Sequence, residues 1–104
     1  MDIKHQFLNS KPRVTKVSIE DVGEVYVRSL TCKEMTLIQN ADDDDKIMLE
    51  FCLGLCDEQG TPAFNFDTDK DELAEIHIHH IIQVVNEIGR NSTLAAKIED
   101  AKKN

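Results

Sequence analysis

The sequence predicts an α+β fold in which an N-terminal β-hairpin packs on a small bundle of three to four α-helices. Two β-rich runs, residues 14–20 and 24–30, are separated by a short loop that ends in Gly23, which is the pattern of a hairpin. The apolar residues after position 31 recur mainly at helical spacing. A lone hairpin is marginally stable in water, so we expect it to lie on these helices or to pair with another chain.

The length of 104 residues suits a single domain, which we place at residues 14–91. Residues 1–13 are expected to form a flexible N-terminal arm, because they hold one pair of adjacent apolar residues and Pro12 discourages regular structure. Residues 92–104 are small and charged, and we expect a frayed C-terminal tail there.

The first predicted helix covers residues 31–40. Thr31 and Glu34 have the spacing of a capping box, in which each side chain bonds the backbone N–H of the other residue. The helical period then places Met35 and Ile38 on the inward face.

A second helix, residues 45–56, is predicted to be the most buried element because it is apolar on nearly all sides. The aspartates at 42–45 precede it, where the helix dipole favours negative charge. Gly60 then belongs to a turn, and we expect the following loop to place Phe64 or Phe66 in the core.

Asp67 or Thr68 is expected to cap a short acidic helix that reaches Ile76. Residues 77–90 contain many β-branched residues, but their polar residues recur every three to four positions, which favours a helix. The sequence leaves open whether residues 69–90 form one helix or two.

The charge distribution argues against nucleic acid and membrane as partners. The net charge is −8, and residues 41–75 hold twelve acids against two lysines, a balance of −10. Such a surface repels nucleic acid and anionic lipid, and no apolar run is long enough to cross a membrane. The charges of residues 1–16 sum to +3. This basic arm is either a solvated tail or a contact for an acidic neighbour, including a second copy of the chain.

We expect neither a cofactor nor catalysis. Asp67, Asp69 and Asp71 open like a calcium loop, but Glu72 and Ile78 stand where the loop needs a glycine and a bidentate glutamate. The chain also lacks a glycine-rich phosphate loop, a Gly-x-Ser-x-Gly motif and a paired-acid signature.

The three cysteines are Cys32, Cys52 and Cys56, and their odd number with no signal-like segment predicts free thiols in a reducing cytoplasm. Cys52 and Cys56 are one helical turn apart, and with His77 and His80 they offer a set of ligands that zinc accepts. The short Cys-x-x-Cys spacing is missing, and both thiols lie in an apolar helix. We therefore expect buried thiols and no structural metal.

The order of elements resembles the tail assembly chaperones of long-tailed bacteriophages. The segments that carry the resemblance are GEVYVRSLT at 23–31, LGLCDEQG at 53–60 and DELAEI at 71–76 with the apolar helix after it, within residues 14–91. The resemblance implies a non-catalytic protein that coats the tape measure protein, keeps it soluble and recruits tail tube subunits. It also implies a host-cytoplasmic protein absent from the mature virion, and a longer form of the same chain made by ribosomal frameshifting.

We expect the protein-binding surface on the two apolar helices, because a core this small cannot hide every apolar group and surplus apolar surface marks binding sites. The candidate residues are Phe51, Leu55, Ile81, Val84 and Ile88. The alternative for each of them is a place in the core. Self-association is also expected, since the edges of a two-stranded hairpin carry unpaired backbone groups.

Two other functions remain open at this point. One is a small phage regulatory or inhibitor protein that binds a host protein through its acidic face. The other is a metal-dependent enzyme.

Overall fold

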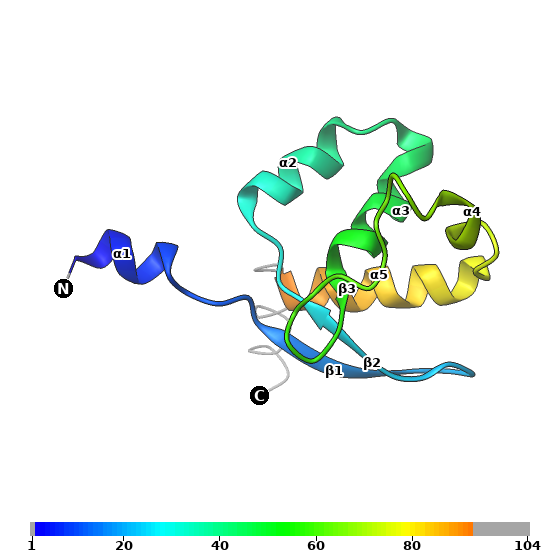
Figure 1. Ribbon diagram of the computed structural model, residues 1–104, viewed down its shortest axis with the longest axis horizontal. Helices are drawn as coiled ribbons and strands as arrows, with labels where there is room; N and C mark the ends of the chain where they lie inside the picture. The colour runs from blue at the N-terminus through cyan, green and yellow to red at the C-terminus, as the bar shows by residue number, and fades with distance from the viewer. Residues whose placement is uncertain (1, 93–104) are drawn as a thin grey trace, which may run out of the picture.

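The computed structural model describes residues 2–92, so all but the first residue of the expected C-terminal tail lies outside the described residues. The described part holds five helices and a three-stranded sheet, and the predicted α+β fold with an N-terminal hairpin is confirmed (Figure 1). The elements in chain order are α1 Ile3–Leu8, β1 Val14–Ile19, β2 Gly23–Arg28, α2 Cys32–Asn40, α3 Asp43–Gly54, β3 Leu55–Cys56, α4 Lys70–Leu73 and α5 Ile78–Ser92.

The hairpin forms because its loop contains residues that accept left-handed backbone. β1 and β2 pair antiparallel and end with Ile19 opposite Gly23. Asp21 has a φ of 67° and Gly23 a φ of 110°, a region that glycine enters without steric cost and that aspartate tolerates. The three-residue connection therefore turns the chain tightly and fixes the register of the two strands.

A third strand was missed by the sequence pattern. The helix expected at 45–56 ends at Gly54, and Leu55 and Cys56 form β3, which pairs with Tyr26 and Val27 of β2. The sheet order is β1-β2-β3. The prediction of helix through residue 56 was wrong because sheet pairing with a segment far away in the sequence overrides a local helical period.

The core lies where α3 crosses α5 and where α5 covers the sheet (Figure 1). Gly54 allows this crossing, because a Cβ at this position would lie 2.4 Å from the Cδ1 atom of Ile88. Ile88 has no exposed surface. The two backbones approach closely at Gly54, and any larger residue there must displace a fully packed side chain.

The capping box of α2 is confirmed, since the Thr31 hydroxyl accepts from the Glu34 N–H and the Glu34 carboxylate accepts from the Thr31 N–H. The Glu34 carboxylate also pairs with the guanidinium of Arg28, which is largely buried. Met35 and Ile38 are only half-buried, as no residue of α2 is fully buried. The ion pair therefore helps to hold a loosely packed helix on the sheet.

The segment after β3 follows the prediction in part. The Asp57 carboxylate accepts from the Gln59 and Thr61 N–H groups and closes the expected turn, with Gly60 at a φ of 88°. Phe64 and Phe66 both pack against the core.

The helix that follows differs from the prediction at both ends. Asp69 occupies the N-cap of α4, not Asp67 or Thr68, and its carboxylate accepts from the Asn65 N–H instead of capping the helix. α4 ends at Leu73, so the question of one helix or two is settled as two, with α5 beginning at Ile78.

The structure places α1 within residues 1–13, where no regular element was predicted. None of its residues is buried, and Figure 1 shows it projecting from the body beside the sheet. The chain returns to the body at Arg13, whose carbonyl oxygen accepts from the Ser29 N–H and from the Asn91 amide.

Candidate protein-binding surface

An apolar pocket of about 220 Å³ lies between the hairpin and the helices. The hairpin contributes Ile19, Val22 and Val25 to its wall. Val22 stands in the tight loop and is 53% exposed, so it forms the rim, whereas Ile19 is buried. The local strand–turn–strand geometry therefore carries one exposed valine to the mouth of an otherwise sheltered cavity.

Helices and the central loop form the rest of the pocket. Phe51 from α3 and Phe64 from the loop pack as an aromatic pair with ring centroids 5.9 Å apart. Leu55 from β3 and Val84 from α5 complete the apolar lining, together with Ile76. Such a concave, mainly apolar surface is suited to taking an apolar side chain of another molecule.

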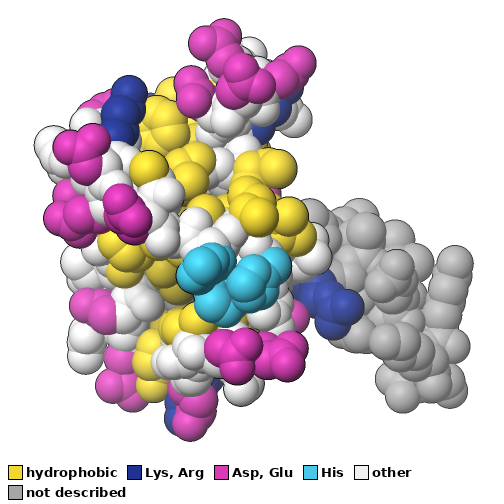
Figure 2. All heavy atoms as spheres, turned by 90° about the vertical axis from the view of Figure 1, so that its right-hand side faces the viewer, with side chains coloured by type: hydrophobic (Ala, Val, Ile, Leu, Met, Phe, Trp, Pro, Cys, Tyr) yellow, Lys and Arg dark blue, Asp and Glu magenta, His cyan; other side chains and the backbone are white. Residues whose placement is uncertain are grey.

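His80 is the one polar side chain of this lining. Its Nε2 atom is buried and has no hydrogen-bond partner among the described residues. The ring lies in a cluster with His77 and His79, with centroid distances of 4.1 Å to His79 and 5.9 Å to His77. Figure 2 shows histidines in the middle of this face, with apolar side chains on both sides of them.

The five residues predicted from sequence all lie in the core, with exposures from 0% for Ile88 to 9% for Leu55. Phe51, Leu55 and Val84 also line the pocket, where a bound group can touch them. Ile81 and Ile88 do not line it. The structure thus joins three of the candidates at one cavity, and the binding role of all five stays a prediction.

A second apolar groove, with a volume of about 420 Å³, runs between α2, α3 and the loop at residues 62–67. Leu37 of α2, which is half-exposed, lines the groove together with Leu49 and Leu53 of α3. Phe66 and Asp67 of the loop also line it. We call this the α2–α3 groove.

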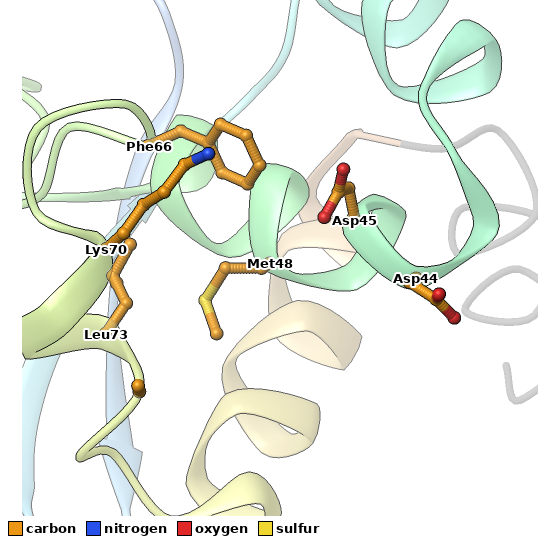
Figure 3. A pocket seen from close by; sticks show the side chains of 7 residues that line it. Asp44, Asp45, Met48, Phe66, Lys70 and Leu73 are labelled. Carbon is orange, nitrogen blue, oxygen red and sulfur yellow. The ribbon is translucent and has the colours of Figure 1, made fainter.

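Phe66 separates the α2–α3 groove from an acidic pocket of about 230 Å³. Asp44 and Asp45 at the start of α3 line this pocket, and the Lys70 ammonium lies over the Phe66 ring, 5.4 Å from its centroid (Figure 3). The α2–α3 groove is therefore apolar inside and flanked by carboxylates.

The cysteines and histidines give no sign of metal chemistry. Within residues 2–92, no group of three or more His, Cys, Asp or Glu side chains is arranged to hold a metal ion. Cys52 and Cys56 are buried, as predicted. Burial raises the pKa of Cys52 to about 11 and also raises the pKa of Cys56, so both stay protonated at neutral pH.

The family model described as phage tail assembly chaperone, TAC, matches residues 3–90. The chain belongs to this family. No curated protein and no solved structure matches the chain significantly. The family match extends the resemblance seen in the sequence toward the N-terminus, so that it includes α1.

Sequence reasoning missed three exposed residues of this tail assembly chaperone: Val22, Leu37 and Phe7. Each had a signal in the sequence, namely an apolar residue inside a polar loop, on a short capped helix or in a basic arm. The signal was weak because single exposed apolar residues are common on protein surfaces. No helix among the described residues is long and apolar enough to cross a bilayer.

Proposed function

We propose that this tail assembly chaperone coats the tape measure protein, keeps it soluble and recruits tail tube subunits. It acts in the host cytoplasm, is absent from the mature virion and catalyses no reaction. The observation that carries the proposal is the apolar pocket beneath the hairpin, with exposed Val22 at its rim and an unpartnered His80 nitrogen in its wall.

The pocket suits one or two apolar side chains of an amphipathic segment. Burial of apolar surface contributes about 25 cal/mol per Å², and the wall already supplies rigid packed partners such as Phe51 and Phe64. On α5, Ile78 and Ile82 are 61% and 45% exposed, and they lie on the side of the helix away from His80 and Val84, which line the pocket. An amphipathic helix bound at the pocket would bury Val22, whereas Ile78 and Ile82 offer a separate apolar surface.

The acidic residues support the solubilising part of the proposal. Figure 2 shows acidic side chains mainly around the apolar and histidine groups of this face. With the apolar groups covered by a bound chain, the remaining surface is dominated by carboxylates, at a net charge of −8. Such charge keeps a coated complex soluble.

We further propose that the chaperone self-associates and works alongside its longer, frameshifted form. Among the described residues, β1 is paired with β2 on one side only, so its other edge presents unpaired backbone groups. The short and long forms would share the surfaces described above.

The test is co-expression of the tape measure protein of the same phage with the wild-type chaperone or with Val22→Glu. Val22 is exposed, so the substitution leaves the fold intact and places a charge at the mouth of the pocket. The matched control is Ile47→Glu, which changes a residue that is 47% exposed and lines none of these pockets.

We expect the wild type and Ile47→Glu to raise the soluble yield of the tape measure protein and to co-purify with it, and Val22→Glu to do neither. Equal co-purification with Val22→Glu would refute the pocket as the binding site. No effect of the wild type on solubility would refute the chaperone function itself.

A further inference from the structure

We propose that α1 of one copy docks into the α2–α3 groove of a second copy. This inference depends on the proposed self-association and gives it a contact other than the unpaired edge of β1. Its starting point is the state of α1 in a single chain. Ile3, Phe7 and Leu8 are 67%, 78% and 70% exposed; Ile3 and Phe7 share one side of the helix because they stand at positions i and i+4, and Leu8 lies about 100° further round, beyond Lys4.

A helix as short as α1 needs a partner to be stable. Helices shorter than about 12–15 residues are marginal in water unless an apolar face is packed, and α1 has six residues with none of them buried. The N-cap bond from the Lys4 N–H to the Asp2 carboxylate is its main local support. The missing stabilisation must come from a surface that covers Phe7 and its apolar neighbours.

The α2–α3 groove has the size and the lining for this helix. Its volume of about 420 Å³ is nearly twice that of the pocket beneath the hairpin, and Leu37, Leu49 and Leu53 offer an apolar bed. Leu37 is itself half-exposed in the single chain. The groove and α1 are thus complementary unpartnered surfaces of the same molecule.

Charge favours the same pairing. The arm that carries α1 is basic, with a balance of +3 over residues 1–16, and Lys4 lies on α1 itself. Asp67 lines the groove, and Asp44 and Asp45 line the pocket beyond Phe66 together with the Lys70 ammonium, so three carboxylates stand against one lysine there. Docking would bring Lys4 toward these carboxylates, and opposite charges of this kind speed and orient association.

The anchoring of the arm favours a second copy over the chain's own groove. Arg13 is held to Ser29 by two hydrogen bonds, from its own N–H to the serine hydroxyl and from the serine N–H to its carbonyl. Pro12 restricts the backbone just before this anchor, and α1 projects away from the body (Figure 1). In such a head-to-tail contact, each added copy leaves one free arm and one free groove, so association does not stop at a dimer.

The test uses two variants, each of which places a charge on one side of the proposed contact. Phe7→Glu changes the apolar face of α1, and Leu37→Glu changes the lining of the groove. Both residues are exposed in the single chain, so the substitutions leave the fold intact. We expect wild-type chaperone and the control Ile47→Glu to self-associate in sedimentation velocity. Each variant alone should associate at least about tenfold more weakly. An equimolar mixture should form a one-to-one dimer, because intact grooves from one variant meet intact arms from the other.

A cross-linking experiment separates docking between copies from docking within a chain. In a Cys32→Ser background, chains with Phe7→Cys are mixed with chains carrying Leu37→Cys. We expect a disulfide-linked heterodimer. A disulfide that forms only inside a chain carrying both substitutions would overturn the inference.

Three further results would also overturn it. If the mixture of Phe7→Glu and Leu37→Glu stays monomeric, the pairing of arm and groove is wrong. If the wild type associates and both variants associate equally well, self-association stands but uses other surfaces. A wild type that remains monomeric at high concentration refutes both the arm–groove contact and self-association. The binding of the tape measure protein is tested separately, by its co-purification with the wild type and the loss of that co-purification in Val22→Glu.

Discussion

The crossing of α3 and α5 gives the sharpest test of the fold, through Gly54→Ala. A new Cβ would lie 2.4, 2.5 and 2.7 Å from three side-chain carbons of Ile88, against about 3.5–4.0 Å for an ordinary carbon contact. Ile88 is fully buried and has no room to move away. Overpacking of this kind costs about 1–3 kcal/mol, and alanine's better helix propensity offsets at most about 1 kcal/mol of it. We therefore expect Gly54→Ala to lower the free energy of unfolding by about 1–2 kcal/mol.

The control for this prediction is Gly89→Ala in α5, where a new Cβ meets nothing within 4 Å. The same substitution should stabilise here by about 0.5–1 kcal/mol through helix propensity alone. Urea unfolding followed by circular dichroism measures both variants. The double variant Gly54→Ala/Ile88→Ala should be more stable than the sum of the two single changes implies, because the clash is gone. A Gly54→Ala variant as stable as Gly89→Ala would refute the close approach of the two helices.

Three further predictions concern single groups and charge. Iodoacetamide should modify one thiol per native chain, at exposed Cys32, and all three thiols in urea. The reason is that burial shields the other two thiols, raising the pKa of Cys52 to about 11 and also raising the pKa of Cys56. Mass spectrometry counts the adducts, and early labelling of Cys52 would contradict its burial. Burial alone would raise the pKa of Glu34, but its bonds to Arg28 and to the Thr31 backbone outweigh burial and lower that pKa below 4.5. The ion pair therefore stabilises the fold above about pH 4.5 and is lost as the pH falls through the lowered pKa. In thermal melts Glu34→Gln should cost about 1–3 kcal/mol at pH 7, and this cost should shrink as the pH is lowered below 4.5. A cost that does not change with falling pH would contradict this. When the salt concentration rises from 0.05 to 0.5 M, self-association measured by sedimentation should weaken, because the Debye length shortens from about 14 to about 4 Å. Association that does not depend on salt would show that charge does not contribute to the proposed contact.

The elements that the sequence predicted correctly are those whose determinants are local. The short loop that ends at Gly23, between two β-rich runs, signals the hairpin, and Thr31 with Glu34 signals the start of α2, because both signals are local in the sequence. β3 could not be predicted in this way, since its reason is pairing with Val27, 28 positions earlier. The late start of α4, at Lys70, likewise depends on a turn in which the Asp69 carboxylate accepts from the Asn65 N–H instead of capping the helix.

The candidate site was predictable only in part, for a related reason. Helical periodicity showed that α3 and α5 are apolar over more than one face, but not which faces meet each other. The residues chosen from that pattern proved to be those that pack helix on helix, such as Ile81 and Ile88. The exposed groups that open onto the pocket and the groove, Val22 and Leu37, sit on elements that looked minor in the sequence.

Together, the pocket beneath the hairpin and the α2–α3 groove suggest how several weak contacts can cover a long chain. The pocket beneath the hairpin, at about 220 Å³, is too small to hold a partner tightly through one or two side chains. The α2–α3 groove draws on a different set of residues, apart from the shared Phe64, so a copy linked through its groove keeps most of its pocket free. Neighbouring copies joined through α1 would present a row of pockets at high effective concentration, which raises the overall affinity for a repetitive apolar chain without strengthening any one contact.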